Sequence, residues 1–169
     1  MKYLTYIRPT QEFERLVLEL YGSSASSLGL HCTLLRFDMD NHNESGLIKC
    51  LSGVMTDMFS ISLSEFDIFD KESFVVKISF NDNLHSLHKQ IVERVRAYNG
   101  YTAEFDQMLE KHCLGNYLDS YHPHITFSRG KNNPDTFSFE KEMFIDKFYL
   151  ARKENCAWEE VSCFKLCRK

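Results

Sequence analysis

One six-residue pattern occurs twice in this chain, and it constrains the fold more than any other feature. Residues 31–36 read His-Cys-Thr-Leu-Leu-Arg and residues 124–129 read His-Ile-Thr-Phe-Ser-Arg, so His, Thr and Arg recur at the same spacing. Both copies lie in apolar, β-compatible stretches, which indicates an internal duplication. Because alternate residues of a strand share a face, each His and its Thr should point to one side of a sheet.

Two such strands, side by side across a pseudo-two-fold axis, would bring together two imidazoles and two hydroxyls. Imidazole titrates near neutral pH, so one His could accept a proton from a nucleophile while the other donates one to a leaving oxygen. The two hydroxyls could hold the non-bridging oxygens of a phosphate. The pattern predicts metal-free phosphodiester chemistry with His31, His124, Thr33 and Thr126 as catalytic residues. The alternative is two half-buried strand histidines satisfied by local hydrogen bonds.

The rest of the sequence predicts an α+β protein with antiparallel pairing. Apolar periodicity and turn residues divide the chain into elements. We expect strands at 2–8, 30–37, 124–129, 143–152 and 158–166; helices at 11–20, 45–58 and 81–98; a hairpin of 60–69 and 73–80 with its turn at 70–72; a Ser/Gly-rich loop at 21–29; a mixed segment at 101–121; and a polar turn at 131–135.

Composition narrows the classes of ligand and compartment. The formal net charge is -4, so no global positive field exists to hold duplex DNA, although one nucleotide or RNA end is allowed. Arg8 and Pro9 interrupt the first apolar run, which argues against a signal segment or a membrane span. Six cysteines without a CxxC pair indicate reduced thiols. We expect a single domain over 1–169, cytoplasmic and monomeric.

The motifs HCTL at 31–34 and HITF at 124–127 resemble the paired signature of the two-histidine (2H) phosphoesterase superfamily. The stretch PHITFSR is similar to the second motif of the RNA 2',3'-cyclic phosphodiesterases historically called 2'-5' RNA ligases. This resemblance implies a bilobal, pseudo-two-fold fold with two antiparallel sheets, outer helices and a central cleft that holds both motifs.

The same resemblance implies an activity. It would be hydrolysis of a 2',3'-cyclic phosphate or a 2',5'-linked diester, in a nucleotide or RNA terminus, without a metal or other cofactor. By resemblance His124 would activate the nucleophile and His31 would protonate the leaving oxygen, with the reverse assignment open. Some members of the family only bind a nucleotide, so a binding module with little turnover is the alternative.

Three further residues are candidates for substrate binding. Family members often carry an Arg at the position of Arg129, where it can contact substrate phosphate or base. Arg129 is five residues after His124, so regular alternation would put the two side chains on different faces of the sheet unless the strand ends at Gly130. Arg36 is related to His31 in the same way, without a following Gly. Tyr121 could stack on a nucleobase.

Tyr6 and Phe37 are weaker stacking candidates, because core positions explain them better. Arg8 could receive a phosphate near the first helix, but a solvated strand end explains it better.

A metal-dependent hydrolase is a third reading of the histidines. His85 and His88 lie one turn apart on a predicted helix, and His122 and His124 are two residues apart. No carboxylate or Cys is placed with them by the sequence, so we expect His85 and His88 on the helix surface. Cys32 should point away from the imidazoles into the core, which argues against a thiol nucleophile.

Overall fold

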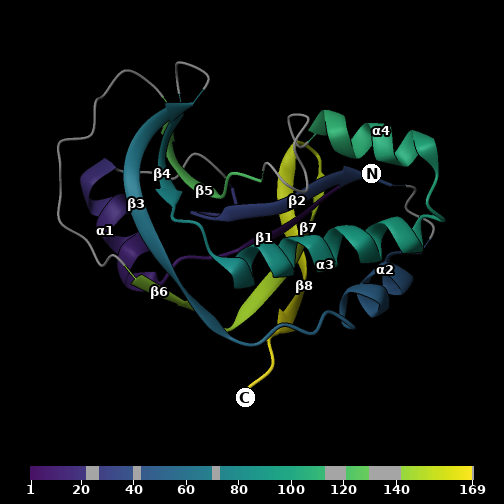
Figure 1. Ribbon diagram of the computed structural model, residues 1–169. Helices are drawn as coiled ribbons and strands as arrows, with labels where there is room; N and C mark the ends of the chain where they lie inside the picture. The colour runs from purple at the N-terminus through teal and green to yellow at the C-terminus, as the bar shows by residue number, and fades with distance from the viewer. Residues whose placement is uncertain (22–26, 40–42, 70–72, 113–120, 130–141, 169) are drawn as a thin grey trace.

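The computed structural model describes residues 1–21, 27–39, 43–69, 73–112, 121–129 and 142–168. In these ranges the chain forms a curled sheet with helices packed against it (Figure 1). The elements in chain order are β1 (Lys2–Ile7), α1 (Gln11–Tyr21), β2 (Cys32–Asp38), α2 (Glu44–Leu51), β3 (Phe59–Phe69), β4 (Ser73–Ile78), α3 (Asp82–Tyr98), α4 (Ala103–His112), β5 (His124–Arg129), β6 (Glu142–Ile145), β7 (Lys147–Glu154) and β8 (Ala157–Lys165).

The eight strands form one sheet in the order β6-β3-β4-β5-β2-β1-β7-β8, and every neighbouring pair is antiparallel. The mixed α and β composition is therefore confirmed, but the expected pair of separate sheets is not what the structure shows. Two four-stranded halves, β8-β7-β1-β2 and β5-β4-β3-β6, meet where the two motif strands pair directly through Cys32 and Ile125. This pairing joins the halves into one sheet.

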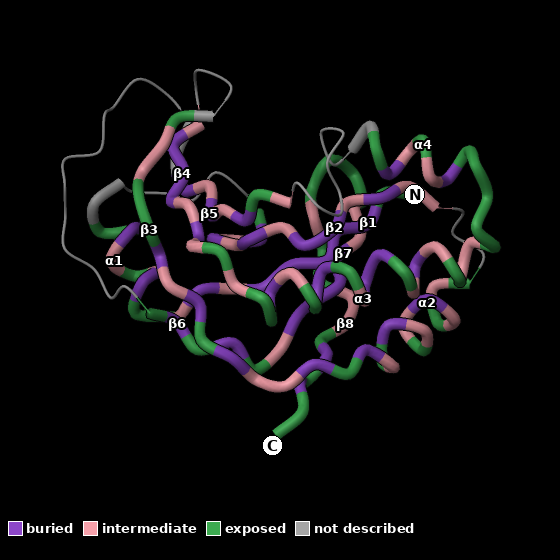
Figure 2. Tube along the Cα trace, viewed as in Figure 1, coloured by how far each residue is buried: buried purple, intermediate pink, exposed green. Residues whose placement is uncertain are grey.

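Helix α3 follows its sequence signals closely. The side chain of Asn81 accepts a hydrogen bond from the Leu84 amide as the N-cap, and the helix ends before Asn99. The apolar positions one and two turns apart, from Leu84 to Val95, are buried. Figure 2 shows the buried stripe along α3, and this helix packs with α4 against β2.

The stretch 143–152, which the sequence predicts as one strand, is two strands. β6 pairs with β3, whereas β7 pairs with β1, so the two lie in different halves of the sheet. The chain turns at Asp146, whose carbonyl accepts a hydrogen bond from the Leu166 amide at 2.8 Å. Alternation of apolar and polar residues indicates which side chains are buried but not which strand is the neighbour. It therefore cannot predict that the chain changes partner strands at Asp146. The helix predicted at 45–58 also ends early, at Leu51.

The predicted turns at 70–72 and 131–135, and most of the Ser/Gly-rich loop, fall outside the described residues. Among the described helices, none combines the length and the apolar character that crossing a membrane requires.

Candidate functional site

The two motif strands pair about a single central point. Cys32 of β2 lies opposite Ile125 of β5 in an antiparallel register. Both side chains are 1% exposed and belong to the core. Each is the second residue of its motif, so the two motifs are related by a local two-fold axis between the strands.

Continuing this register by one residue in each direction places His31 opposite Thr126 and His124 opposite Thr33. Residues directly opposite each other share a face, so these four polar residues lie on the face away from the buried second residues. His31 and His124 are diagonal neighbours in such a ladder, about 7–8 Å apart, a separation at which both side chains can reach one phosphate. The structure thus brings together all four predicted catalytic residues.

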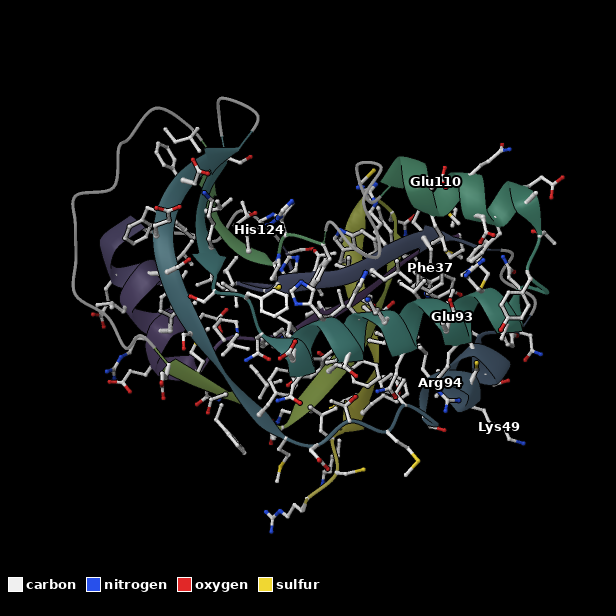
Figure 3. All side chains as sticks on the ribbon, viewed as in Figure 1. Phe37, Lys49, Glu93, Arg94, Glu110 and His124 are labelled. Carbon is white, nitrogen blue, oxygen red and sulfur yellow. The ribbon has the colours of Figure 1, made fainter. Side chains whose placement is uncertain are left out.

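Both imidazoles are held in the same way. Nδ1 of His31 lies 3.0 Å from the carbonyl oxygen of Gly29, and Nδ1 of His124 lies 2.9 Å from that of His122. A carbonyl only accepts hydrogen bonds, so Nδ1 carries the hydrogen in both rings. Nε2 is therefore the nitrogen that each histidine offers to a substrate. Figure 3 shows His124 near the middle of the sheet, at the start of β5.

A tight turn positions the first histidine. Gly29 has a φ of 74°, and a Cβ at this position would collide with the carboxylate of Glu14 on α1. That carboxylate accepts a hydrogen bond from the Leu30 amide at 3.2 Å. Helix α1 therefore fixes the segment whose carbonyl orients His31.

Each motif strand contains a β-bulge at the fourth motif residue. The register between β1 and β2 skips Leu34, and that between β4 and β5 skips Phe127. Both residues are 1% exposed. Beyond a bulge the alternation shifts by one residue, so the parity argument against Arg36 and Arg129 does not hold.

The structure describes these two arginines to different extents. Because of the bulge at Leu34, Arg36 lies on the same face of the sheet as Thr33. The Nε of Arg36 is buried and has no hydrogen-bond partner among the described residues. The backbone of Arg129 pairs with Ser73, and its side chain lies outside the described residues.

A cation flanks His31 on its outer side. The register Ile7 opposite Cys32 continues to Arg8 opposite His31. The Arg8 guanidinium forms an ion pair with Glu160 at 2.9 Å and lies 4.8 Å from the Tyr149 ring centroid. Arg8 thus follows the end of β1 with 37% of its side chain exposed, and it is held by an ion pair and an aromatic ring in addition to solvent.

A second cation flanks His124. Lys77 of β4 is its register partner. The Lys77 ammonium lies 2.7 Å from Asp67 and 3.0 Å from Glu65, both on β3. Sequence reasoning missed Lys77 because only the strand register places it beside the second motif.

The surroundings of His31 favour its neutral form. Burial lowers the pKa of His31, and the positive charges of Arg8 and His124 lower it further, against the opposing effect of the Gly29 carbonyl. Tyr6 contacts the imidazole edge-on, with the ring centroids 5.4 Å apart. The lowered pKa of His31 favours its uncharged form at neutral pH.

The three aromatic residues considered for stacking on a nucleobase differ in their burial. Tyr6 and Phe37 are fully buried, as core residues are. Tyr121 is half-buried; its hydroxyl donates to the Thr33 carbonyl at 2.8 Å, and its ring stacks on His88 at 4.1 Å. Tyr121 thus supports the first motif strand from the helix side of the sheet.

The expectation that His88 lies on the helix surface is wrong. His88 is 1% exposed, and its Nδ1 donates to the Leu34 carbonyl at 2.7 Å. Leu34 is the bulged residue, whose carbonyl takes no part in regular pairing, so His88 satisfies a polar group that the bulge frees.

Within the described ranges, no three residues of the His, Cys, Asp and Glu types converge as metal ligands would. Cys32 is buried against the Tyr121 hydroxyl at 3.6 Å, and burial raises the pKa of its thiol to about 11. A thiol in this state is a poor nucleophile.

Comparisons with known proteins identify the family and the fold. A family model described as the 2'-5' RNA ligase superfamily matches residues 7–164. The structure of TT0787 of Thermus thermophilus is similar, with a TM-score of 0.74 and 16% identity over 98% of this chain and 97% of that one. That of E. coli LigT complexed with 3'-AMP has a TM-score of 0.69 and 13% identity, over 99% and 98% of the chains. A search of curated protein sequences finds no significant match.

Proposed function

Because the chain belongs to the 2'-5' RNA ligase superfamily, we propose that it is a phosphodiesterase that hydrolyses a 2',3'-cyclic phosphate or a 2',5'-linked diester of a nucleotide or an RNA end. The observation that carries this proposal is the pairing of the two His-x-Thr segments about Cys32 and Ile125. E. coli LigT has been crystallised with 3'-AMP and with phosphate, which supports a nucleotide phosphate as the ligand.

The phosphate lies between the two histidines in this proposal. The hydroxyls of Thr33 and Thr126 donate to its non-bridging oxygens and stabilise the negative charge that grows on them during attack. Holding the phosphorus between an acid and a base also removes the entropic cost of assembling them. All four side chains come from one chain, so we propose that a monomer suffices.

Hydrolysis then needs two proton transfers. Water attacks the phosphorus while one imidazole Nε2 takes its proton. The bond from phosphorus to the ribose oxygen breaks, and the other imidazole donates its Nε2 proton to that oxygen. Exchange with solvent restores both histidines.

We assign the base to His31 and the acid to His124, the reverse of the assignment that the resemblance implies. His31 faces a cation with one carboxylate partner, whereas the cation beside His124 has two carboxylate partners, Asp67 and Glu65. Of these described ion-pair groups, the one beside His124 carries the more negative charge, which suits a protonated imidazole. The lowered pKa of His31 suits a base.

The proposal is tested with 2',3'-cyclic nucleotides and 2',5'-oligoadenylate, in EDTA, using the wild type, His31→Ala and His124→Ala. We expect turnover by the wild type in EDTA and a loss of at least about 100-fold in each variant. Unchanged melting temperatures would show that the variants fold. Loss of activity in EDTA would refute the metal-free mechanism, and binding of 3'-AMP without any turnover would indicate a nucleotide-binding module.

A further inference from the structure

Few backbone contacts join the two halves of the sheet. Cys32 and Ile125 are the one registered pair between β2 and β5 in the described ranges, whereas β4 and β5 share five registered pairs. Register is fixed by the sum of such pairs, so a single pair holds the two motif strands only weakly against each other. Other contacts are needed to keep the two motifs at a constant distance.

The side chain of Tyr121 crosses this junction. Tyr121 lies three residues before His124, and its hydroxyl donates to the Thr33 carbonyl in the first motif at 2.8 Å. The Cys32 thiol lies 3.6 Å from the same hydroxyl. One side chain therefore ties the segment before β5 to the strand that carries the first motif.

Packing against α3 holds the Tyr121 ring in place. The ring stacks on His88 with the centroids 4.1 Å apart and the planes 5° apart, and His85 meets it edge-on at 5.5 Å. His88 in turn donates to the Leu34 carbonyl at 2.7 Å. The two stacked rings thus donate to successive carbonyls of the first motif strand, those of Thr33 and Leu34.

The three residues that follow carry this tie to the second histidine. His122 comes directly after Tyr121, and its carbonyl accepts the hydrogen bond from Nδ1 of His124. The Pro123 ring fixes its own φ, and the Pro123 carbonyl accepts from the Ile78 amide at 3.0 Å. Because this segment has little freedom, a movement of Tyr121 would displace the carbonyl that orients His124.

We propose that the Tyr121 hydroxyl is a positioning group, which sets the distance and orientation of His124 relative to the first motif by holding the Thr33 carbonyl. This inference rests on the proposed function, because that reaction needs both imidazoles at one phosphate. A misplacement of about 1 Å can lower a rate about 100-fold, so one hydrogen bond across this junction can control the rate.

The test compares Tyr121→Phe with the matched control Tyr98→Phe. Each variant loses one hydroxyl that donates to a backbone carbonyl at 2.8 Å, because the Tyr98 hydroxyl donates to the Asn43 carbonyl. Tyr98 is the last residue of α3 and Asn43 caps α2, so the control bond joins two helices and neither motif strand. Tyr121→Phe keeps the ring, and with it the stack on His88.

With a 2',3'-cyclic nucleotide, we expect Tyr121→Phe to lower kcat at least about tenfold and to leave KM within about twofold of the wild type. Alignment of the acid with the leaving oxygen acts in the transition state, whereas the threonine hydroxyls still bind the ground-state phosphate. Tyr98→Phe should leave kcat and KM unchanged. Melting temperatures of both variants show that the assays use folded protein. A wild-type kcat in Tyr121→Phe would overturn the inference, as would equal losses of kcat in the two variants.

A second measurement requires no turnover. In proton–nitrogen NMR spectra of the imidazoles, Tyr121→Phe should move the His124 signals and Tyr98→Phe should not; unchanged His124 signals in Tyr121→Phe would overturn the inference. A wild type that hydrolyses no diester would refute the phosphodiesterase, while a shift confined to Tyr121→Phe would still support the positioning of His124. A wild type that hydrolyses cyclic nucleotides with a kcat indifferent to Tyr121→Phe would support the phosphodiesterase and refute the positioning role.

Discussion

The division of labour between the two histidines can be tested through the leaving group. A ribose oxygen leaves poorly without a proton, whereas a 4-nitrophenolate leaves readily as an anion. Removing the general acid should therefore harm a cyclic nucleotide far more than a 4-nitrophenyl ester of the same nucleotide. We assign this role to His124, whose Nδ1 donates to the His122 carbonyl, so that Nε2 is the nitrogen that acts on the substrate.

The expected size follows from one imidazole in each role. A general acid or base contributes about 10²–10⁴ in rate, or about 2.7–5.5 kcal/mol of transition-state stabilisation. We expect His124→Ala to lose this factor on a 2',3'-cyclic nucleotide but less than about tenfold on the 4-nitrophenyl ester. His31→Ala removes the base, so it should lose about 10² or more on both substrates.

The assay compares kcat/KM for both substrates across the wild type and the two variants. Rescue of His31→Ala by the 4-nitrophenyl ester, with no rescue of His124→Ala, would reverse the assignment and restore the one implied by the resemblance. With the ester, the wild-type rate should fall only as the pH drops through the lowered pKa of His31, that is, below its ordinary value of 6.5. A fall centred above 6.5 would contradict this reasoning.

Three further predictions concern the supporting residues. Arg8→Met removes a positive charge that lowers the pKa of His31, so that pKa should rise, and titration of the imidazole by NMR would detect it; an unchanged or lower value would contradict the placement of Arg8. Thr126→Val keeps the shape of the side chain but removes a hydroxyl donor, so kcat should fall by about 100-fold with little change in melting temperature; full activity would exclude a role in charge stabilisation. His88→Ala leaves the Leu34 carbonyl buried without its partner, so urea unfolding should show a loss of about 1–3 kcal/mol; a neutral result would mean that water replaces the imidazole.

Much of the geometry of the candidate site was predictable from the sequence because it depends on local pattern. The strict His-x-Thr spacing sets which residues share a face, and the structure pairs the two motif strands as the duplication suggests. The α3 boundaries were equally predictable, since Asn81 and the apolar periodicity act within the helix itself.

The features that were not predictable depend on strand register. The bulges at Leu34 and Phe127 change parity within the motif, and no local pattern indicates them. Arg8 and Lys77 become neighbours of the histidines only through pairing with strands distant in sequence. His88 is buried because a carbonyl freed by a bulge needs a donor there. The division of residues 142–154 into β6 and β7 likewise depends on pairing with distant strands, because β6 pairs with β3 and β7 pairs with β1.

That split has a consequence for how the chain folds during synthesis. β5-β4-β3-β6 comes from one continuous stretch, residues 59–145, whereas the other half combines β1 and β2 with β7 and β8 from the far end of the chain. While the ribosome makes the middle of the protein, the outer edge of β1 has no partner, and pairing over this sequence separation is slow. The half of the sheet that contains the first motif strand is therefore completed only after β7 and β8 emerge. Until then that open edge can associate with the strands of other chains.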